Sequence, residues 1–250
     1  MKTFRAELHI HTVLSPCAEI EMLPPLIVME CLDRGISLIA ITDHNATANI
    51  SAVQQAAQGT DLTVLPGMEV QTREEVHSLC LFNTLEQALA WQEIVDQHLP
   101  YIPNRPDYFG DQLIVDFNGD FIGKEERLLL NSVNLSLSEA YQKVTELGGL
   151  FIPAHINRTA NGLIPILGLP PVDIPIEVME ISRHLKPAEA VKMYPFLKDY
   201  TLIQSGDAHR LEEILGLNLF TIESPTTEEI LLALRGAQNR SHRILSTTLS

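Results

Sequence analysis

The sequence predicts an α/β protein, built either as a barrel of alternating strands and helices or as a doubly wound sheet. Short apolar runs rich in β-branched residues alternate with segments of helical spacing. The runs are too continuous for strands with one wet face, and they suit parallel strands buried on both faces. The 250 residues, 45% of them hydrophobic, are enough for one sizeable core, and single-domain α/β barrels commonly reach this length.

The apolar runs are the predicted strands: Phe4–His11, Ile36–Asp43, Leu62–Val70, Val76–Phe82, Leu150–His155, Ile176–Ile181 and Tyr200–Asp207. The clearest predicted helices are Leu26–Leu32, Ala46–Gln58, Leu85–His98, Ser138–Leu147, Pro187–Leu197 and Thr227–Leu234. Helix signals agree with these ranges. Pro24 and Pro25 stand where a helix would begin, Ser136 and Glu139 have the spacing of a capping box, and Gly35 follows a helix as a stop.

The stretch 99–132 interrupts the alternation. It begins with Pro100, Pro103 and Pro106, and two short apolar runs then flank Asn118-Gly119, which is a strong hairpin signal. We interpret this stretch as a hairpin-containing insertion in a single domain that spans 1–250. The insertion serves either as a lid or dimer contact, or only as a passive elaboration of the surface.

The formal net charge is −15 and the isoelectric point about 4.9. So acidic a surface repels nucleic-acid backbones at long range, and we therefore expect no long nucleic acid among the partners. A short oligonucleotide or a small phosphoester can still bind, because bound divalent cations reverse the local field. Ordinary solubility charge explains the larger share of the acidity.

The first residues, Met1 to His11, contain charged side chains and no apolar core of a signal peptide. No apolar run approaches the length that spans a membrane, so we expect no membrane partner. The three cysteines, Cys17, Cys31 and Cys80, are odd in number and widely spaced, which disfavours a disulfide framework. The expected compartment is the reducing cytoplasm.

Residues of the metal-binding types recur where the apolar runs end. His9 and His11 close the first run, and side chains at i and i+2 share one face of a strand, so both imidazoles can reach one ion. The residues at the other run ends are Asp43, His44, Glu69, His77, His155, Asp207 and His209. Each alone has an ordinary explanation as a cap, a turn or a hydrogen-bonded core residue. Together they indicate a metal site at one rim of a barrel, with Zn²⁺, Mn²⁺ or Fe²⁺ favoured by the imidazoles.

These residues also carry a resemblance. His9-Ile-His-Thr-Val-Leu-Ser15, Ile41-Thr-Asp-His-Asn45, Pro66-Gly-Met-Glu69, His77, Pro153-Ala-His155 and Ser205-Gly-Asp-Ala-His209 together resemble the PHP superfamily, named for polymerase and histidinol phosphatase domains. The motifs span almost the whole chain. The resemblance implies a distorted (β/α)7 barrel, which the apolar runs fit independently. It is closest to small stand-alone phosphoesterases that act on nucleotides or other small phosphomonoesters, with histidinol phosphate as a second substrate class.

The resemblance implies two to three metal ions, held by His9, His11 and Asp207, by Glu69, His77 and His155, and by His44 and His209. Glu69 would bridge the first two. The third ion needs one more ligand shortly after His11, where the family usually has Asp or His and this chain has Ser15-Pro16-Cys17. Cys17 is either a thiolate ligand, which favours zinc or iron, or a loop cysteine without a metal.

Clustered divalent ions supply hydroxide near neutral pH and stabilise an in-line displacement at phosphorus. Glu69 and Asp207 are the expected catalytic ligands, and Asp43 orients a ligand or handles a proton. Arginine matches phosphate bidentately, and three arginines near strand ends are candidates: Arg158, Arg183 and Arg210. Each is otherwise a salt-bridged surface residue. Glu180 either pairs with such an arginine or lies inside the barrel.

The sequence thus predicts a metal-dependent phosphoesterase acting on a small phosphorylated substrate. Three alternatives stay open. An exonuclease acting on short oligonucleotides would need a basic strip beside the metals, whereas the 17 Lys and Arg residues are scattered. A non-catalytic regulatory PHP module would be favoured by loss of ligands. A non-phosphate amidohydrolase shares the His-x-His pattern but usually has a carboxylated lysine where this chain has Glu69.

Overall fold

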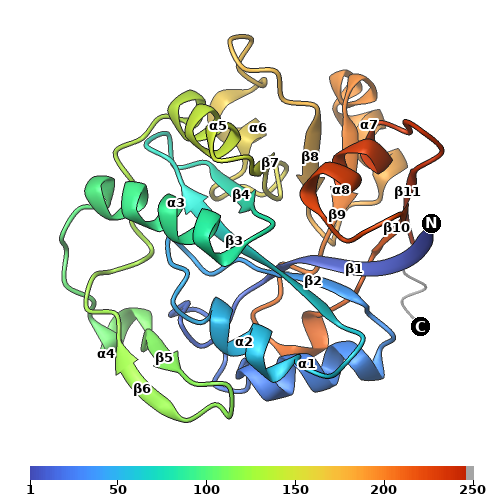
Figure 1. Cartoon of the computed structure of the whole chain (residues 1–250). Coiled ribbons are helices and arrows are strands. Elements are labelled where there is room, and N and C mark those ends of the chain that lie inside the picture. The colour runs from blue at the N-terminus through green and yellow to red at the C-terminus, as the bar shows by residue number, and fades with distance from the viewer. Residues whose placement is uncertain (246–250) are drawn as a thin grey trace.

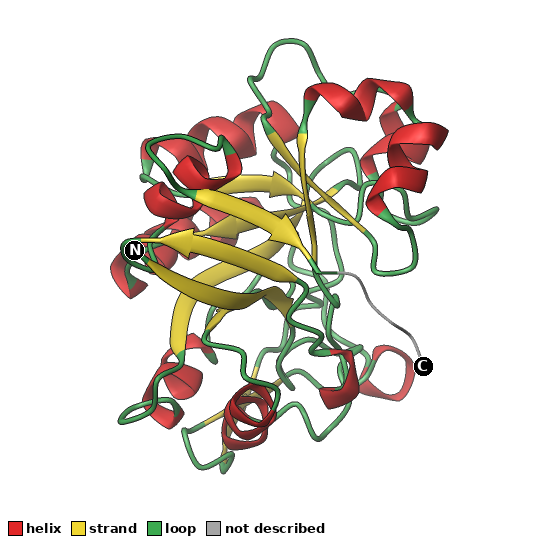
Figure 2. Ribbon diagram, turned by 90° about the vertical axis from the view of Figure 1, so that its right-hand side faces the viewer, coloured by secondary structure: helices red, strands yellow, loops and turns green. Residues whose placement is uncertain are grey.

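The computed structural model describes residues 1–245. A curled mixed sheet lies at its centre with helices packed around it (Figures 1 and 2). The sheet has the order β11-β10-β1-β2-β3-β4-β7. Its strands are β1 (Lys2–Ile10), β2 (Leu38–Ile41), β3 (Thr63–Gln71), β4 (His77–Leu81), β7 (Leu150–Pro153), β10 (Asn218–Ile222) and β11 (Ser241–Ile244). A separate parallel pair is formed by β8 (Val178–Ile181) and β9 (Thr201–Gln204).

Strand directions differ from the expected all-parallel arrangement. β1, β2 and β3 are parallel neighbours, but β4 runs antiparallel to both β3 and β7. Only residues 72–76 join β3 to β4, and a parallel return would require a crossover of a dozen or more residues. The prediction of a parallel strand is therefore wrong for β4. β10 and β11, which were not predicted, add an antiparallel edge beside β1.

The predicted strands nevertheless follow one another around a distorted barrel. Beyond the end of β7, the backbone N–H of Ile156 donates to the carbonyl of Glu180 in β8 at 2.9 Å. Beyond β9, Ala208 exchanges backbone hydrogen bonds with the end of β1, donating to the His9 carbonyl at 3.0 Å and accepting from the N–H of His11 at 2.9 Å. The fold is thus a mixed α/β fold with a curled half-barrel sheet. A strict (β/α)7 repeat is met only in part, since no helix separates β3 from β4.

The six predicted helices are confirmed, with slightly different ends: α1 (Pro24–Asp33), α2 (Ile50–Ala56), α3 (Leu85–His98), α5 (Leu137–Glu146), α7 (Pro187–Met193) and α8 (Thr227–Leu234). Ser136 and Glu139 form the predicted capping box of α5. Fully buried side chains such as Trp91 and Val144 fasten the helices to the sheet, and burial of apolar surface is the dominant favourable term in folding. The predicted helix Pro187–Leu197 is divided into α7 and the short helix η1 (Pro195–Asp199). Short helical segments that were not predicted are α6 (Leu163–Leu167) and η2 (Leu211–Glu213).

The predicted hairpin in the insertion is confirmed. After the short helix α4 (Pro106–Phe109), strands β5 (Leu113–Val115) and β6 (Phe121–Lys124) pair antiparallel around Asn118-Gly119. Gly119 has a φ of 87°, a conformation that glycine adopts without strain. The hairpin packs against the loop that follows β1, because the N–H of Leu113 donates to the carbonyl of Val13 at 2.9 Å.

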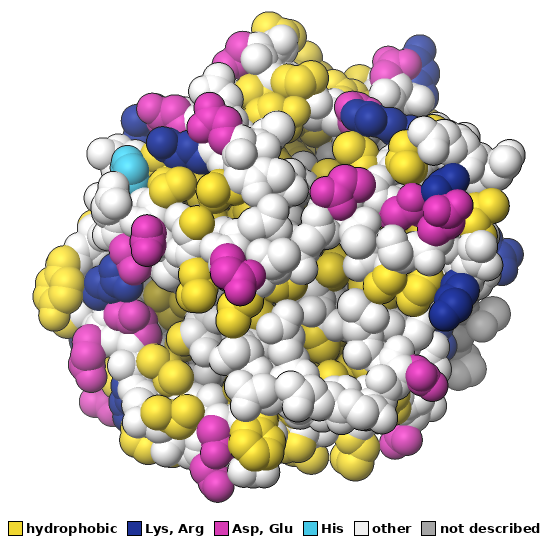
Figure 3. Space-filling model, in the orientation of Figure 1, with side chains coloured by type: hydrophobic (Ala, Val, Ile, Leu, Met, Phe, Trp, Pro, Cys, Tyr) yellow, Lys and Arg dark blue, Asp and Glu magenta, His cyan; other side chains and the backbone are white. Residues whose placement is uncertain are grey.

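Acidic and basic side chains are interspersed over the face of the molecule shown in Figure 3. Among residues 1–245, no helix has both the length and the apolar character needed to cross a membrane. Cys17, Cys31 and Cys80 are free thiols, as their spacing predicted.

Candidate metal centre

Most of the predicted ligands come together at one rim of the barrel. The histidines and carboxylates at this rim come from the carboxyl ends of β1, β3 and β7 and from the loops after β2 and β9. His77 joins them from the amino end of β4, because an antiparallel strand begins where its parallel neighbours would end. His9, His11 and Glu69 are completely buried there.

Glu69 lies at the centre of the cluster. Its Oε1 is 2.9 Å from His77 Nδ1, 2.9 Å from His155 Nε2 and 3.3 Å from His9 Nε2. Its Oε2 is 2.9 Å from His44 Nδ1 and 3.4 Å from His11 Nε2. One carboxylate thus faces imidazoles from both of its oxygens, which is the arrangement that a bridging ligand requires.

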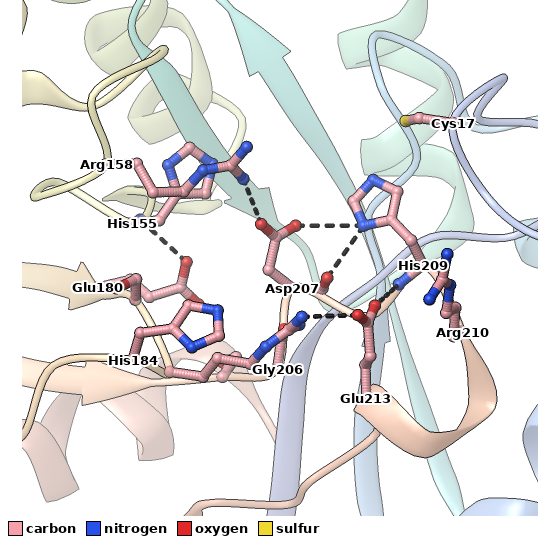
Figure 4. A pocket seen from close by; sticks show the side chains of 13 residues that line it. Cys17, His155, Arg158, Glu180, His184, Gly206, Asp207, His209, Arg210 and Glu213 are labelled. Carbon is pink, nitrogen blue, oxygen red and sulfur yellow. Dashed lines mark hydrogen bonds and ion pairs between the residues drawn. The ribbon is translucent and has the colours of Figure 1, made fainter.

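Asp207 closes the cluster on the side of the cavity (Figure 4). Its Oδ1 lies 3.4 Å from His9 Nε2, 3.5 Å from His11 Nε2 and 3.6 Å from His209 Nδ1. The other oxygen, Oδ2, forms an ion pair with Arg158. The Asp207 side chain therefore links the histidine cluster to the Arg158 guanidinium at the cavity wall.

The donor atoms fit divalent metal ions. Three groups have donor atoms within 4.8 Å of one another: His9, His11 and Glu69; His44, Glu69 and His77; and His11, His44 and His209. Glu69 Oε2 and Asp207 Oδ1 are buried, and although imidazole nitrogens lie 2.9 to 3.6 Å away, neither oxygen accepts a hydrogen bond. A buried carboxylate oxygen without a hydrogen bond is costly unless it coordinates a cation. Mixed imidazole and carboxylate donors are the ligand types that zinc, manganese and iron accept.

The electrostatics favour the ligating forms of Glu69, Asp207 and His11. Burial opposes ionisation of Glu69, but the surrounding imidazoles, above all that of His77, outweigh it and hold the pKa of Glu69 well below its usual range. Burial also opposes ionisation of Asp207, and nearby His9 and His11 again lower its pKa. Burial, with the neighbouring imidazoles of His209 and His44, lowers the pKa of His11 and favours its neutral form. Burial opposes protonation of His9, but the carboxylates of Glu180 and Glu69 outweigh it and raise the pKa of His9.

Two ligand-bearing residues have unusual backbone conformations. His155 and Asp207 have positive φ values of 29° and 51°, a region that residues other than glycine rarely occupy. His155 lies two residues after β7 and Asp207 three residues after β9, where the chain turns while the side chain stays aimed at the rim. Backbone strain of this kind clusters at functional sites.

Asp43 lies at the edge of the cluster and holds the loop after β1. Its Oδ1 accepts from the Thr12 N–H at 2.7 Å and from the Ser15 hydroxyl at 2.7 Å, and its Oδ2 accepts from the Thr12 hydroxyl at 2.8 Å. Ser15 Oγ is also 2.9 Å from His11 Nδ1. These contacts support a role for Asp43 in orienting a ligand through Ser15.

Cys17 lies on the exposed side of the cluster, near His44 and His209. Protein packed around the thiol would raise its pKa, but these two imidazoles outweigh that effect and lower the pKa of Cys17 to about 6. Cys17 is absent from the three compact donor groups among residues 1–245. Its assignment as a ligand of a third ion stays a prediction.

We expect Cys17 to be alkylated by iodoacetamide in chelator-treated protein with a rate that rises as pH passes through about 6, because its lowered pKa generates thiolate there. Cys31 and Cys80 serve as internal controls, since both are buried and burial raises their pKa. Peptide mass spectrometry over a pH series measures the three rates. Zinc that slows only Cys17 would support ligation, and a Cys17 rate unaffected by zinc would assign the thiol to the loop alone.

The three predicted phosphate-binding arginines line one cavity of about 540 Å³ beside the cluster. Arg158 reaches Asp207 (Figure 4). Arg183 donates to the Gly206 carbonyl and to Glu213. Arg210 pairs with Glu19 at 3.0 Å on the exposed side. Of the three, Arg158 combines contact to a predicted ligand with a half-exposed side chain.

Two buried carboxylates support the ligand loops and were not identified as such from the sequence. Glu7 is completely buried and accepts from the backbone N–H groups of Gly206, Leu215 and Gly216 at 2.8 to 3.0 Å. Glu180 accepts from His9 Nδ1 at 2.9 Å rather than from an arginine. A charged residue inside a buried strand run was the available signal, since such charges are rarely buried without partners.

The sequence matches no protein-family model and no curated protein sequence. Solved structures do share the fold. The lesion-specific endonuclease PfuEndoQ from Pyrococcus furiosus is 19% identical, with a TM-score of 0.70, and the match covers 96% of this chain and 58% of that chain. This chain thus spans less than two thirds of the endonuclease.

Two smaller proteins also match. A putative metal-dependent phosphoesterase from Bifidobacterium adolescentis is 18% identical with a TM-score of 0.54, covering 82% of this chain and 87% of that one. An amidohydrolase from Chromobacterium violaceum, with bound sulfate, is 18% identical with a TM-score of 0.57, covering 85% and 90%. The neighbours include PHP-type folds, so the resemblance to the PHP superfamily is confirmed at the level of the fold.

One expectation is overturned by these structures. Endonuclease Q, 19% identical over 96% of this chain with a TM-score of 0.69, was crystallised with a 27-mer duplex that carries an abasic lesion at the active site. The exclusion of long nucleic acid on the basis of net charge was therefore wrong. Net charge averages over the whole surface, whereas a phosphate backbone responds to the local field, which metal ions can invert.

Proposed function

We propose that this protein is a metal-dependent hydrolase of phosphoesters that uses two or three divalent ions. The observation that carries the proposal is the convergence on Glu69, whose two oxygens face five imidazoles in a buried pocket. Glu69 is the bridging ligand of this proposal, and Asp207 completes the centre towards the cavity. Divalent ions held here would lower the pKa of a bound water and offset charge on the phosphoryl oxygens.

Other residues would bind the phosphate and position the ligands. Arg158, held beside the centre by Asp207, would donate hydrogen bonds to the oxygens of a phosphoryl group bound at the same rim. Asp43 and Ser15 fix the position of His11. The cavity of about 540 Å³ lies within the usual range for small-ligand sites, roughly 300 to 1,000 Å³, which supports a nucleotide or another small phosphomonoester as substrate.

The test is a metal and substrate panel. Protein purified without chelator is analysed for metals, and phosphomonoesters and phosphodiesters are then assayed with added Mn²⁺, Zn²⁺ or Fe²⁺. We expect at least two metal equivalents per chain and metal-dependent release of phosphate. Bound metal without hydrolysis of any phosphoester would contradict the proposal, and would favour either a regulatory module or, if amides are cleaved, an amidohydrolase.

A second candidate function is cleavage of DNA phosphodiesters. It is favoured by the fold shared with endonuclease Q over 96% of this chain. A 27-mer duplex with an abasic site and the same duplex without it, added to the panel, decide between the two candidates. Cleavage of the lesion duplex at rates above those of every phosphomonoester would establish the nuclease activity as the main one.

The Arg158→Ala variant is expected to raise the KM for a phosphomonoester by about tenfold or more, because a hydrogen bond to a charged group contributes roughly 1.5–3 kcal/mol. Metal content should stay unchanged, since Arg158 is not a ligand. Steady-state kinetics with elemental analysis measures both. Arg235→Ala, which removes another exposed arginine paired with Glu177, is the control. An unchanged KM in Arg158→Ala would exclude Arg158 from phosphate binding.

A further inference from the structure

Glu180 is a buried carboxylate in an apolar strand. All four residues of β8 are buried, and Glu180 is only 1% exposed. An ionisable group in such surroundings costs free energy unless its hydrogen bonds compensate. The hydrogen bonds of Glu180 therefore identify the groups that compensate for burying its carboxylate.

The first contact fixes a predicted metal ligand. Glu180 Oε2 lies 2.9 Å from Nδ1 of His9. A carboxylate accepts hydrogen bonds, so Nδ1 carries the proton, and the lone pair used for ligation lies on Nε2. His9 Nε2 in turn lies 3.1 Å from His11 Nε2 and 3.3 Å from Glu69 Oε1. The contact thus aims the ligating nitrogen of His9 at the centre.

The second contact fixes another ligand through its backbone. Glu180 Oε2 also accepts from the N–H of His155 at 3.1 Å, where the backbone φ of His155 is positive. The carbonyl of Glu180 accepts from the next N–H, that of Ile156. His155 Nε2 then lies 2.9 Å from Glu69 Oε1. One residue of β8 therefore holds ligands that belong to β1 and to the end of β7.

The arginines considered as partners of Glu180 pair with other groups. Arg158 pairs with Asp207, and Arg183 with Glu213 and the Gly206 carbonyl. The other oxygen of Glu180, Oε1, is buried without a hydrogen-bond partner. The hydrogen bonds that the Glu180 side chain accepts thus come from His9 and His155, and not from an arginine.

We propose that Glu180 is a positioning residue that holds His9 in the orientation presenting Nε2 to a metal ion, and holds the backbone turn that aims His155 at the same centre. This inference rests on the metal centre of the proposed function. A carboxylate behind a ligating histidine fixes the ring and raises its basicity, and loss of such a partner typically weakens metal binding by about 10- to 100-fold.

Metal affinity tests the proposal. Competition with a chromophoric chelator is measured for wild type, Glu180→Ala, Glu180→Gln and Glu177→Ala, with unfolding of chelator-treated protein monitored in parallel. Glu177 precedes β8, is exposed and pairs with Arg235, so it controls for loss of a carboxylate. We expect zinc binding about 10- to 100-fold weaker in Glu180→Ala, a smaller loss in Glu180→Gln, whose amide oxygen still accepts from Nδ1–H, and none in Glu177→Ala. Wild-type affinity in Glu180→Ala would overturn the proposal.

A spectroscopic signature separates positioning from a purely structural role. In ¹⁵N-labelled wild type, the His9 Nδ1–H proton should give a downfield, slowly exchanging resonance, retained in Glu180→Gln and lost in Glu180→Ala. If Glu180→Ala does not fold, loss of the resonance in Glu180→Gln decides against the proposal. Neither readout requires turnover. Wild type that binds zinc and shows these effects without hydrolysing phosphoesters would refute the proposed function and leave the role of Glu180 standing.

Discussion

Replacement of Glu69 by Gln is expected to abolish hydrolysis and to release at least one metal equivalent per chain. Both oxygens of Glu69 face imidazoles within 3.4 Å. An amide removes the negative charge and turns one of the two acceptors into a donor, so that group cannot bridge two cations. Bound metal contributes several kcal/mol of transition-state stabilisation, and the rate should therefore fall by about a thousandfold or more.

Elemental analysis and phosphate release measure this result. Glu93→Gln, the same substitution at an exposed position of α3, is the control and should behave as wild type. Circular dichroism should show a folded Glu69→Gln protein, because the amide is nearly the same size as the carboxylate. Full activity or unchanged metal content in the folded variant would refute the bridging role.

Replacement of Asp207 by Asn is expected to lower the rate by about a hundredfold to a thousandfold, the range seen when one preorganised electrostatic group is removed from an active site. Asp207 Oδ1 lies 3.4 to 3.6 Å from three imidazole nitrogens and has no hydrogen-bond partner. Asparagine keeps the shape but carries no charge, so it should weaken the binding of an ion that His9 and His11 would hold. It also releases Arg158 from its ion pair.

A metal titration distinguishes the two effects. The variant should recover part of its activity at raised Mn²⁺ or Zn²⁺ concentration if weakened metal binding dominates. Asp199→Asn, an exposed position before β9, is the matched control and should titrate as wild type. Asp207→Asn with wild-type affinity and rate would place Asp207 outside the metal centre.

Local patterns predicted many elements well. The continuous run Leu150–His155 corresponds to β7, and the segment Leu85–His98 corresponds to α3. Both were predictable because burial on two faces and the 3.6-residue helical period appear as patterns among neighbouring residues. The Asn118-Gly119 turn likewise identified its hairpin. The direction of β4 was missed, since run composition is the same for a strand of either direction. The short link 72–76 was the signal that excluded a parallel return.

The candidate ligands could also be predicted from local patterns, but their partners could not. His9 and His11 were recognisable because i, i+2 spacing brings two imidazoles to one face of a strand, and Glu69 because a carboxylate ends an apolar run. For Glu180 the sequence left open an arginine partner or a place inside the barrel, and the structure buries it there and pairs it with His9. The partner of a side chain depends on which strands become neighbours, and residues 9 and 180 meet only through the closure of the barrel.

By itself the sequence determined the residue types available for metal binding, the strand ends that carry them and the helices that cover the sheet, since each follows from patterns within a few consecutive residues. Only the tertiary structure decided that β4 runs backwards to bring His77 to the rim, that Asp207 joins Arg158 to the histidines, and that Glu7 and Glu180 hold the ligand loops. Such contacts join residues far apart in the chain, and their geometry is set by packing of the whole core rather than by any local preference.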